Sequence, residues 1–116
     1  MHLDDIVDKI KKSDGYPKVG MILCHNGVVR STSRDGRSVR EITVQVDRGR
    51  LERLLAEMRN SKGIVDVLAE IREGTLYPGE DIMVVAVAGD IRENVFPVLM
   101  ETVNRIKAEV TRKTER

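Results

Sequence analysis

Four basic side chains stand near the ends of predicted elements, where together they could bind an anion. Arg30 follows a strand, Arg92 follows an apolar strand over residues 82–88, and Lys107 and Lys113 lie along the helix that comes next. Arginine and lysine hold carboxylates and phosphates through charge-assisted hydrogen bonds. Taken singly, each of these side chains is more typical of a solvated surface charge than of a binding site. The residues alone leave both interpretations open, a basic pocket and a set of exposed cations.

The other reactive side chains favour no nucleophilic or metal site. Cys24 is the only cysteine, which excludes an internal disulfide and any multi-cysteine metal site. His25 follows it directly, and neighbours on a strand point to opposite faces, so a Cys-His dyad is not expected. We interpret His25 as a turn residue and Cys24 as a buried apolar side chain. The second histidine, His2, lies at the amino terminus, and we expect no metal site.

Composition is typical of one compact domain that covers residues 1–116. The chain is 41% apolar and 34% charged, and its net charge is +1. This charge balance, with one Phe, two Tyr and no Trp, gives no case for a nucleic-acid partner. The apolar runs are too short to cross a bilayer, and the acidic amino terminus lacks a signal-peptide core. We therefore expect a cytoplasmic protein with no membrane partner.

Hydrophobic periodicity predicts an α+β fold, a mixed sheet with packed helices, in the order α-β-β-α-β-β-α. Strands are expected over residues 19–24, 39–46, 64–72 and 82–88. Helices are expected over residues 3–12 and 48–59 and from residue 91 or 94 onward. The run over 82–88 has no polar alternation, which indicates a strand that is covered on both faces.

Local signals refine three of these elements. Asp47 is a good amino-terminal cap for the helix over 48–59, which carries its buried stripe on Leu51, Leu54, Leu55 and Met58. An Asp-Gly pair at residues 35–36 predicts the tip of a β-hairpin. Pro97 allows either a helix that starts near residue 91 and contains the proline, or a later start at an Asn94 cap.

Several motifs, in the same order along the chain, resemble the large (catalytic) subunit of molybdopterin synthase. The most specific is the Gly-x-Leu-x-Pro-Gly-Glu pattern of residues 74–80. The others are Gly-Val-Val-Arg at 27–30, Arg-Asp-Gly at 34–36, the apolar strand to residue 88, Arg92 with Phe96, Lys107, and Lys-Thr-Glu at 113–115. The resemblance runs from residue 19 to residue 115.

This resemblance implies an α/β hammerhead fold, a homodimer and a sulfurtransferase activity. Members of the family bind a small ubiquitin-like sulfur carrier with a Gly-Gly carboxyl terminus. They transfer sulfur from its thiocarboxylate to a cyclic pyranopterin monophosphate, in molybdenum cofactor biosynthesis, without a cofactor of their own. By position, Lys107 and Lys113 resemble the catalytic pocket lysines, and Arg30 and Arg92 resemble the arginines that bind the anionic substrate.

Two departures from the family pattern leave an alternative open. The position before Arg92 is usually histidine in the family and is Ile91 here. Residues 110–112, before Lys113, replace a segment rich in aromatic residues. The alternative hypothesis is a divergent relative that keeps the fold and a carrier-binding or dimerisation role but lacks the chemistry.

Overall fold

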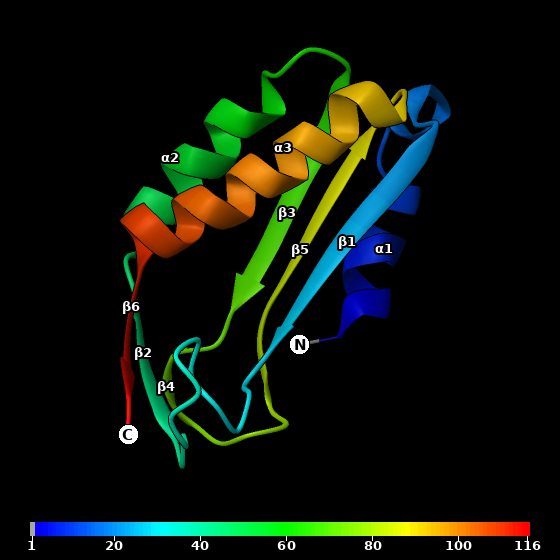
Figure 1. The fold of residues 1–116 in the computed structure, drawn as a ribbon. Helices are drawn as coiled ribbons and strands as arrows, with labels where there is room; N and C mark the ends of the chain where they lie inside the picture. The colour runs from blue at the N-terminus through cyan, green and yellow to red at the C-terminus, as the bar shows by residue number, and fades with distance from the viewer. Residues whose placement is uncertain (1) are drawn as a thin grey trace.

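The computed structural model describes residues 2–116, which form three α-helices, six strands and two short helical turns (Figure 1). The helices are α1 (Leu3–Lys11), α2 (Arg48–Arg59) and α3 (Arg92–Arg105), with a 3₁₀ turn η1 (Tyr16–Lys18) and a π-helical turn η2 (Ile106–Val110). The strands are β1 (Met21–Val28), β2 (Ile42–Val46), β3 (Ile64–Ile71), β4 (Gly74–Leu76), β5 (Asp81–Gly89) and β6 (Thr111–Glu115). None of the helices in this part of the chain is long and apolar enough to cross a membrane.

The larger sheet has the strand order β1-β5-β3, with both pairs antiparallel. Its central strand β5 is buried on both faces, as its unbroken apolar run predicts. Val85 and Val87 face the main core, where α2 and α3 pack, whereas Ala86 faces a second cluster formed with Ile6 and Ile10 of α1. Figure 1 shows α2 and α3 on one face of this sheet and α1 on the other.

The smaller sheet has the order β4-β2-β6, again antiparallel, and lies beyond the carboxyl end of α3 (Figure 1). Two of its strands were not expected from the sequence. Residues 74–76 were expected in a loop but form β4, and residues 111–115 were expected in the last helix but form β6. Both edges of β2 thereby gain a partner, and its Ile42 and Val44 side chains are buried in the main core.

The expected hairpin does not form. The turn is present, since Gly36 adopts a left-handed φ of 86° and its N–H bonds the Ser33 carbonyl, but β1 and β2 belong to different sheets. Only the isolated bridge between Thr32 and Ser38 pairs the two arms of the loop. The apolar β1 pairs instead with β5, which offers it a full-length partner and a covered face.

The signals at the ends of α2 and α3 have clear outcomes. The Asp47 side chain accepts a hydrogen bond from the Arg50 N–H at 3.0 Å, which confirms the cap, and the predicted stripe of α2 is buried. Helix α3 begins at Arg92, so the early start is correct and Pro97 lies inside the helix. Pro97 leaves the exposed Glu93 carbonyl without its intrahelical donor, which water can replace.

Candidate functional site

A cavity of about 750 Å³ lies between the two sheets. The larger sheet contributes the end of β1 and the start of β5, and the smaller sheet contributes β2 and β6. The loop after β1 and the turn η2 complete its wall. Its polar and charged lining residues are His25, Asn26, Arg30, Thr32, Arg34, Lys107, Thr111, Lys113 and Glu115. This volume suits a small-molecule ligand.

Three of the four residues predicted for the site line this cavity. Arg30 comes from the loop after β1, and Lys107 comes from η2, the turn that follows α3. Lys113 was expected on a helix but lies on β6, where it pairs with Val44 across the smaller sheet. Residues far apart in the sequence therefore meet because the turn η2 directs the chain from α3 back along β2.

Arg92 is not among the residues that line the cavity. It is the first residue of α3, its side chain is 80% exposed, and its nearest carboxylate is that of Glu93 at 3.6 Å. Lys107 lies beyond the other end of the same helix, roughly 20 Å away along the axis at 1.5 Å per residue. Within one copy of the chain, Arg92 and Lys107 do not form a common site.

The cavity carries an excess of positive charge. Four cations line it, Arg30, Arg34, Lys107 and Lys113, against the single carboxylate of Glu115. Lys113 and Glu115 form a loose pair at 3.9 Å. Among residues 2–116, no carboxylate lies within ion-pair distance of the other three cations. Positive charge in a concave site focuses the field and attracts anions.

His25 is a site residue that the sequence analysis assigned wrongly, as part of a turn. Strand β1 continues through it to Val28, and His25 pairs with Val85 of β5, so the only irregularity falls between Gly27 and Val28. The imidazole lines the cavity. Burial and the charge of Lys107 lower the pKa of His25 below its usual value. The sequence held one signal for this position. If β1 continues past a buried Cys24, strand alternation puts the His25 side chain on the opposite face of the sheet.

Cys24 lies on the opposite face of β1, against the cluster that α1 covers. Burial raises the pKa of its thiol, which keeps it in the unreactive protonated form. The structure thus separates Cys24 from His25, as the alternation of a strand requires. No group of three or more His, Cys, Asp or Glu side chains in the described residues is arranged to hold a metal ion.

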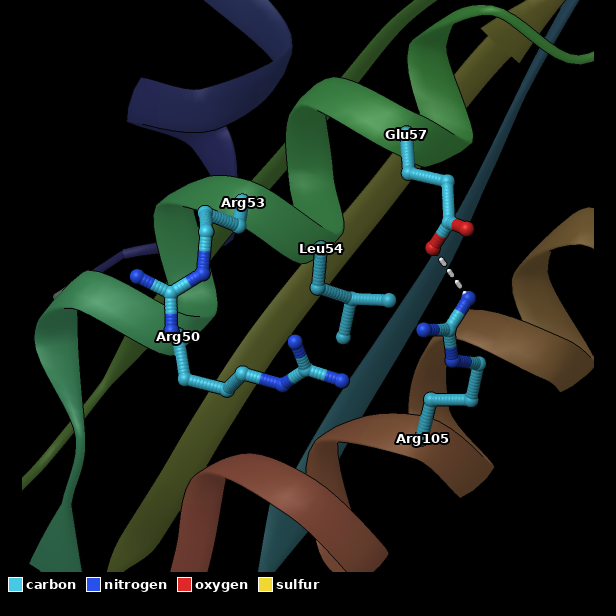
Figure 2. A pocket seen from close by; sticks show the side chains of 5 residues that line it. All are labelled: Arg50, Arg53, Leu54, Glu57 and Arg105. Atoms are coloured by element: carbon cyan, nitrogen blue, oxygen red, sulfur yellow. Dashed lines mark hydrogen bonds and ion pairs between the residues drawn. The ribbon is translucent and has the colours of Figure 1, made fainter.

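A second, smaller cavity of about 340 Å³ lies between α2 and α3, and two of its three arginines, Arg50 and Arg105, form ion pairs. Figure 2 shows the pair between Arg105 and Glu57. Arg105 bonds Glu57 and also reaches Glu109 of η2 at 2.7 Å, while Arg50 of α2 bonds Glu109 from the other side. These contacts raise the pKa of Arg105 and lower that of Glu109 to about 2. The network joins α2 to the turn that carries Lys107, so we assign it a structural role.

We expect the Glu109 network to stabilise the fold in a pH-dependent way. The pKa of Glu109 is about 2 in the folded chain and roughly 4.3 when unfolded, so its contribution is present above about pH 4.3 and is lost as pH falls through about 2. Glu109→Gln should lower the melting temperature at pH 7 and flatten its decline between about pH 5 and 2. Circular dichroism melts across this range measure both effects. Glu52→Gln, at an exposed position of α2, is the matched control. Parallel acid profiles of Glu109→Gln and wild type would contradict the assignment.

Comparison with known proteins decides the family. The family model described as "MoaE protein" matches residues 1–109. The chain belongs to the MoaE family. The match includes Arg30, Arg92 and Lys107 and ends before Lys113.

Individual proteins of similar length agree with this assignment. The MoaE family chain is 30% identical over 109 residues to an uncharacterized protein of Methanocaldococcus jannaschii, covering 90% of this chain and 87% of that protein. It is 29% identical to molybdopterin cofactor biosynthesis protein E of Burkholderia multivorans, whose structure it matches with a TM-score of 0.78 over 100% of this chain and 82% of that one. The family model and the match to the Burkholderia multivorans protein support a role in molybdenum cofactor biosynthesis.

Two more distant structures bear on the fold alone. Molybdopterin synthase from Staphylococcus aureus matches with a TM-score of 0.82 at 16% identity, over 100% of this chain and 85% of that one. A chain from the complex of subunits 1 and 2 of molybdopterin-converting factor from Helicobacter pylori matches with a TM-score of 0.74 at 12% identity, over 99% and 78%. The α+β fold expected from the sequence, with its hammerhead-like arrangement, is confirmed. The expected mixed sheet is replaced by two antiparallel sheets.

Proposed function

We propose that this MoaE family chain is the sulfur-transferring subunit of a molybdopterin synthase. Its substrates would be a thiocarboxylated ubiquitin-like carrier with a Gly-Gly carboxyl terminus and a cyclic pyranopterin monophosphate. The observation that carries the proposal is the cavity between the two sheets, in which Arg30, Lys107 and Lys113 meet and cations exceed carboxylates. Family membership supplies the reaction class, and the cavity supplies a place for it.

The chemistry of the lining suits both substrates. The pterin phosphate and the carrier thiocarboxylate are anions, and the guanidinium group of Arg30 can hold a phosphate through two parallel hydrogen bonds. When the carbonyl carbon of the carrier's last glycine becomes tetrahedral, its oxygen gains negative charge. The ammonium groups of Lys107 and Lys113 would stabilise that oxygen. The buried Ile42 and Val44 side chains wall the cavity and limit the water that would screen these charges.

The carrier is proposed as a small protein partner. The homologous Helicobacter pylori structure is a complex of two subunits, which supports a partner of this kind for the present chain. We also place the reaction in the cytoplasm, because a thiocarboxylate and the single free Cys24 suit a reducing compartment.

A homodimer would give Arg92 its proposed role in substrate binding. Phe96 is 53% exposed and Met100 is 66% exposed, and four-residue spacing places them on one stripe of α3. Arg92 is the first residue of this helix. We propose that a second copy of the chain covers this apolar stripe and that Arg92 then faces the cavity of the partner copy.

Shared sites predict a specific rescue. Lys107→Ala and Arg92→Ala, each expressed alone, should both be inactive. Co-expression should restore about a quarter of the wild-type activity, because half of the dimers would be mixed and one of the two sites in each would keep both residues. The rate of product formation by the purified mixture measures this. A mixture without activity would show that Arg92 does not act across a dimer.

The test of the proposed function supplies purified chain, thiocarboxylated carrier and the pyranopterin precursor, and measures molybdopterin. Formation of molybdopterin that depends on the chain is the expected result. Carrier binding without product formation would contradict the catalytic proposal and support the alternative of a non-catalytic relative.

A further inference from the structure

His25 occupies a position in the cavity that the motifs of the family do not explain. Its imidazole lies over the backbone of Gly27, two residues along β1, because a Cβ placed at Gly27 would be 3.3 Å from Nε2. Residues two apart on a strand share a face, and both residues line the cavity. Among residues 2–116, no side-chain hydrogen bond engages either ring nitrogen. The half-buried ring therefore has unused hydrogen-bonding capacity next to space that a ligand can fill.

The charges around this ring are nearly all positive. The strands β2 and β5 contribute only apolar side chains to this wall, namely Ile42, Val44, Ile82 and Met83. The titratable groups come from the loop after β1, from η2 and from β6, and they are Arg30, Arg34, Lys107, Lys113 and Glu115. An empty cavity of this composition disfavours a proton on His25, because the imidazolium would face further cations.

We propose that His25 couples the binding of a phosphate-type oxyanion in this cavity to the uptake of one proton. The bound anion offsets the surrounding cations, so a proton from solvent adds to the free ring nitrogen of His25. Both ring nitrogens are then N–H donors, and the one that faces the ligand donates to an anion oxygen. This inference rests on the proposed function, in which the cavity receives the phosphate of the pterin substrate.

Linkage fixes the direction of the effect. The pKa of His25 in the empty cavity lies below its usual value through burial and the charge of Lys107. A bound anion must raise that pKa, and by reciprocity protonation must tighten anion binding. Affinity should therefore rise as pH falls between the pKa of the empty and the occupied site, by up to about tenfold per pH unit for one coupled proton.

Sulfate is the probe of choice, because it has the shape and charge of a phosphate group and does not titrate in this range. Calorimetry of sulfate binding to the full chain at about pH 6, in two buffers of different ionisation enthalpy, counts the protons taken up. The expected wild-type result is a measurable uptake of protons, at most about one per sulfate bound. His25→Gln should bind sulfate without buffer dependence and with an affinity independent of pH. His2→Gln, which alters the other histidine at an exposed site outside the cavity, should behave as wild type.

A second measurement does not depend on the folding of a variant. Nuclear magnetic resonance titration of the histidine ring protons in the wild-type chain should show that sulfate raises the pKa of His25, with the ring-proton signals of His2 serving as the internal control. Sulfate binding without proton uptake and without a shift of His25 would overturn the inference while leaving the anion cavity intact. Coupling seen with an acetylated Gly-Gly peptide and absent with sulfate would also overturn it, since the carboxylate would then be the coupled anion. Failure to bind sulfate at any pH would contradict both the assignment of the cavity as an anion site and the proposed role of His25.

Discussion

Replacing Lys107 by alanine should lower kcat/KM for molybdopterin formation by about 100- to 1,000-fold, the usual cost of removing one group that stabilises an oxyanion. We expect this large loss because Lys107 projects from η2 into the cavity and no carboxylate among residues 2–116 pairs with its ammonium group. Its side chain is exposed, so the fold should not change. Steady-state kinetics and a thermal melt of the same preparation measure both expectations.

The controls separate a local role for Lys107 from a general effect of charge. Lys62→Ala removes an exposed lysine that lies in the turn between α2 and β3 and should keep full activity. Lys107→Arg keeps the charge but changes its shape and reach, and we expect it to retain sulfate binding better than turnover. A Lys107→Ala variant with more than about a tenth of wild-type activity would remove this residue from the mechanism.

Replacing the neighbouring Ile106 by alanine should cost about 2–5 kcal/mol of folding free energy, the range for emptying a large buried aliphatic site. Ile106 is fully buried in the main core and is the first residue of η2. The expected fall in melting temperature is about 10 °C or more for a domain of this size. Urea unfolding followed by circular dichroism gives the free energy directly.

An isoleucine that is exposed to solvent provides the matched control. Ile91→Ala changes the same side chain at a position that is 53% exposed, and it should alter stability by less than about 0.5 kcal/mol. Equal losses for the two variants would mean that the burial of Ile106 does not anchor the turn that carries Lys107.

The parts of the fold that follow from local chemistry could be predicted from the sequence. The stripe and cap of α2 depend only on residues within one helix, and the two-sided burial of β5 follows from seven consecutive apolar side chains. The amphipathic α1 is of the same kind, since Ile6 and Ile10 are buried at helical spacing. In each case, the residues within the segment are enough to predict its structure.

The parts that depend on distant partners could not be predicted in this way. Residues 111–115 are mostly polar, and they form β6 because β2 offers them an open edge. The loop around Gly36 has the residues of a hairpin turn, but β1 pairs with β5 and not with β2. The meeting of Arg30 with Lys107 depends on the arrangement of two sheets, so it was expected only through the family resemblance.

The last strand has a practical consequence for work with this protein. Glu115 lines the cavity, and the backbone of Arg116 is hydrogen-bonded to Arg40 and Glu41. Any residues that follow Arg116, whether natural or added as a purification tag, would emerge beside this cavity. A fusion at the amino terminus would instead start next to α1, on the other face of the larger sheet.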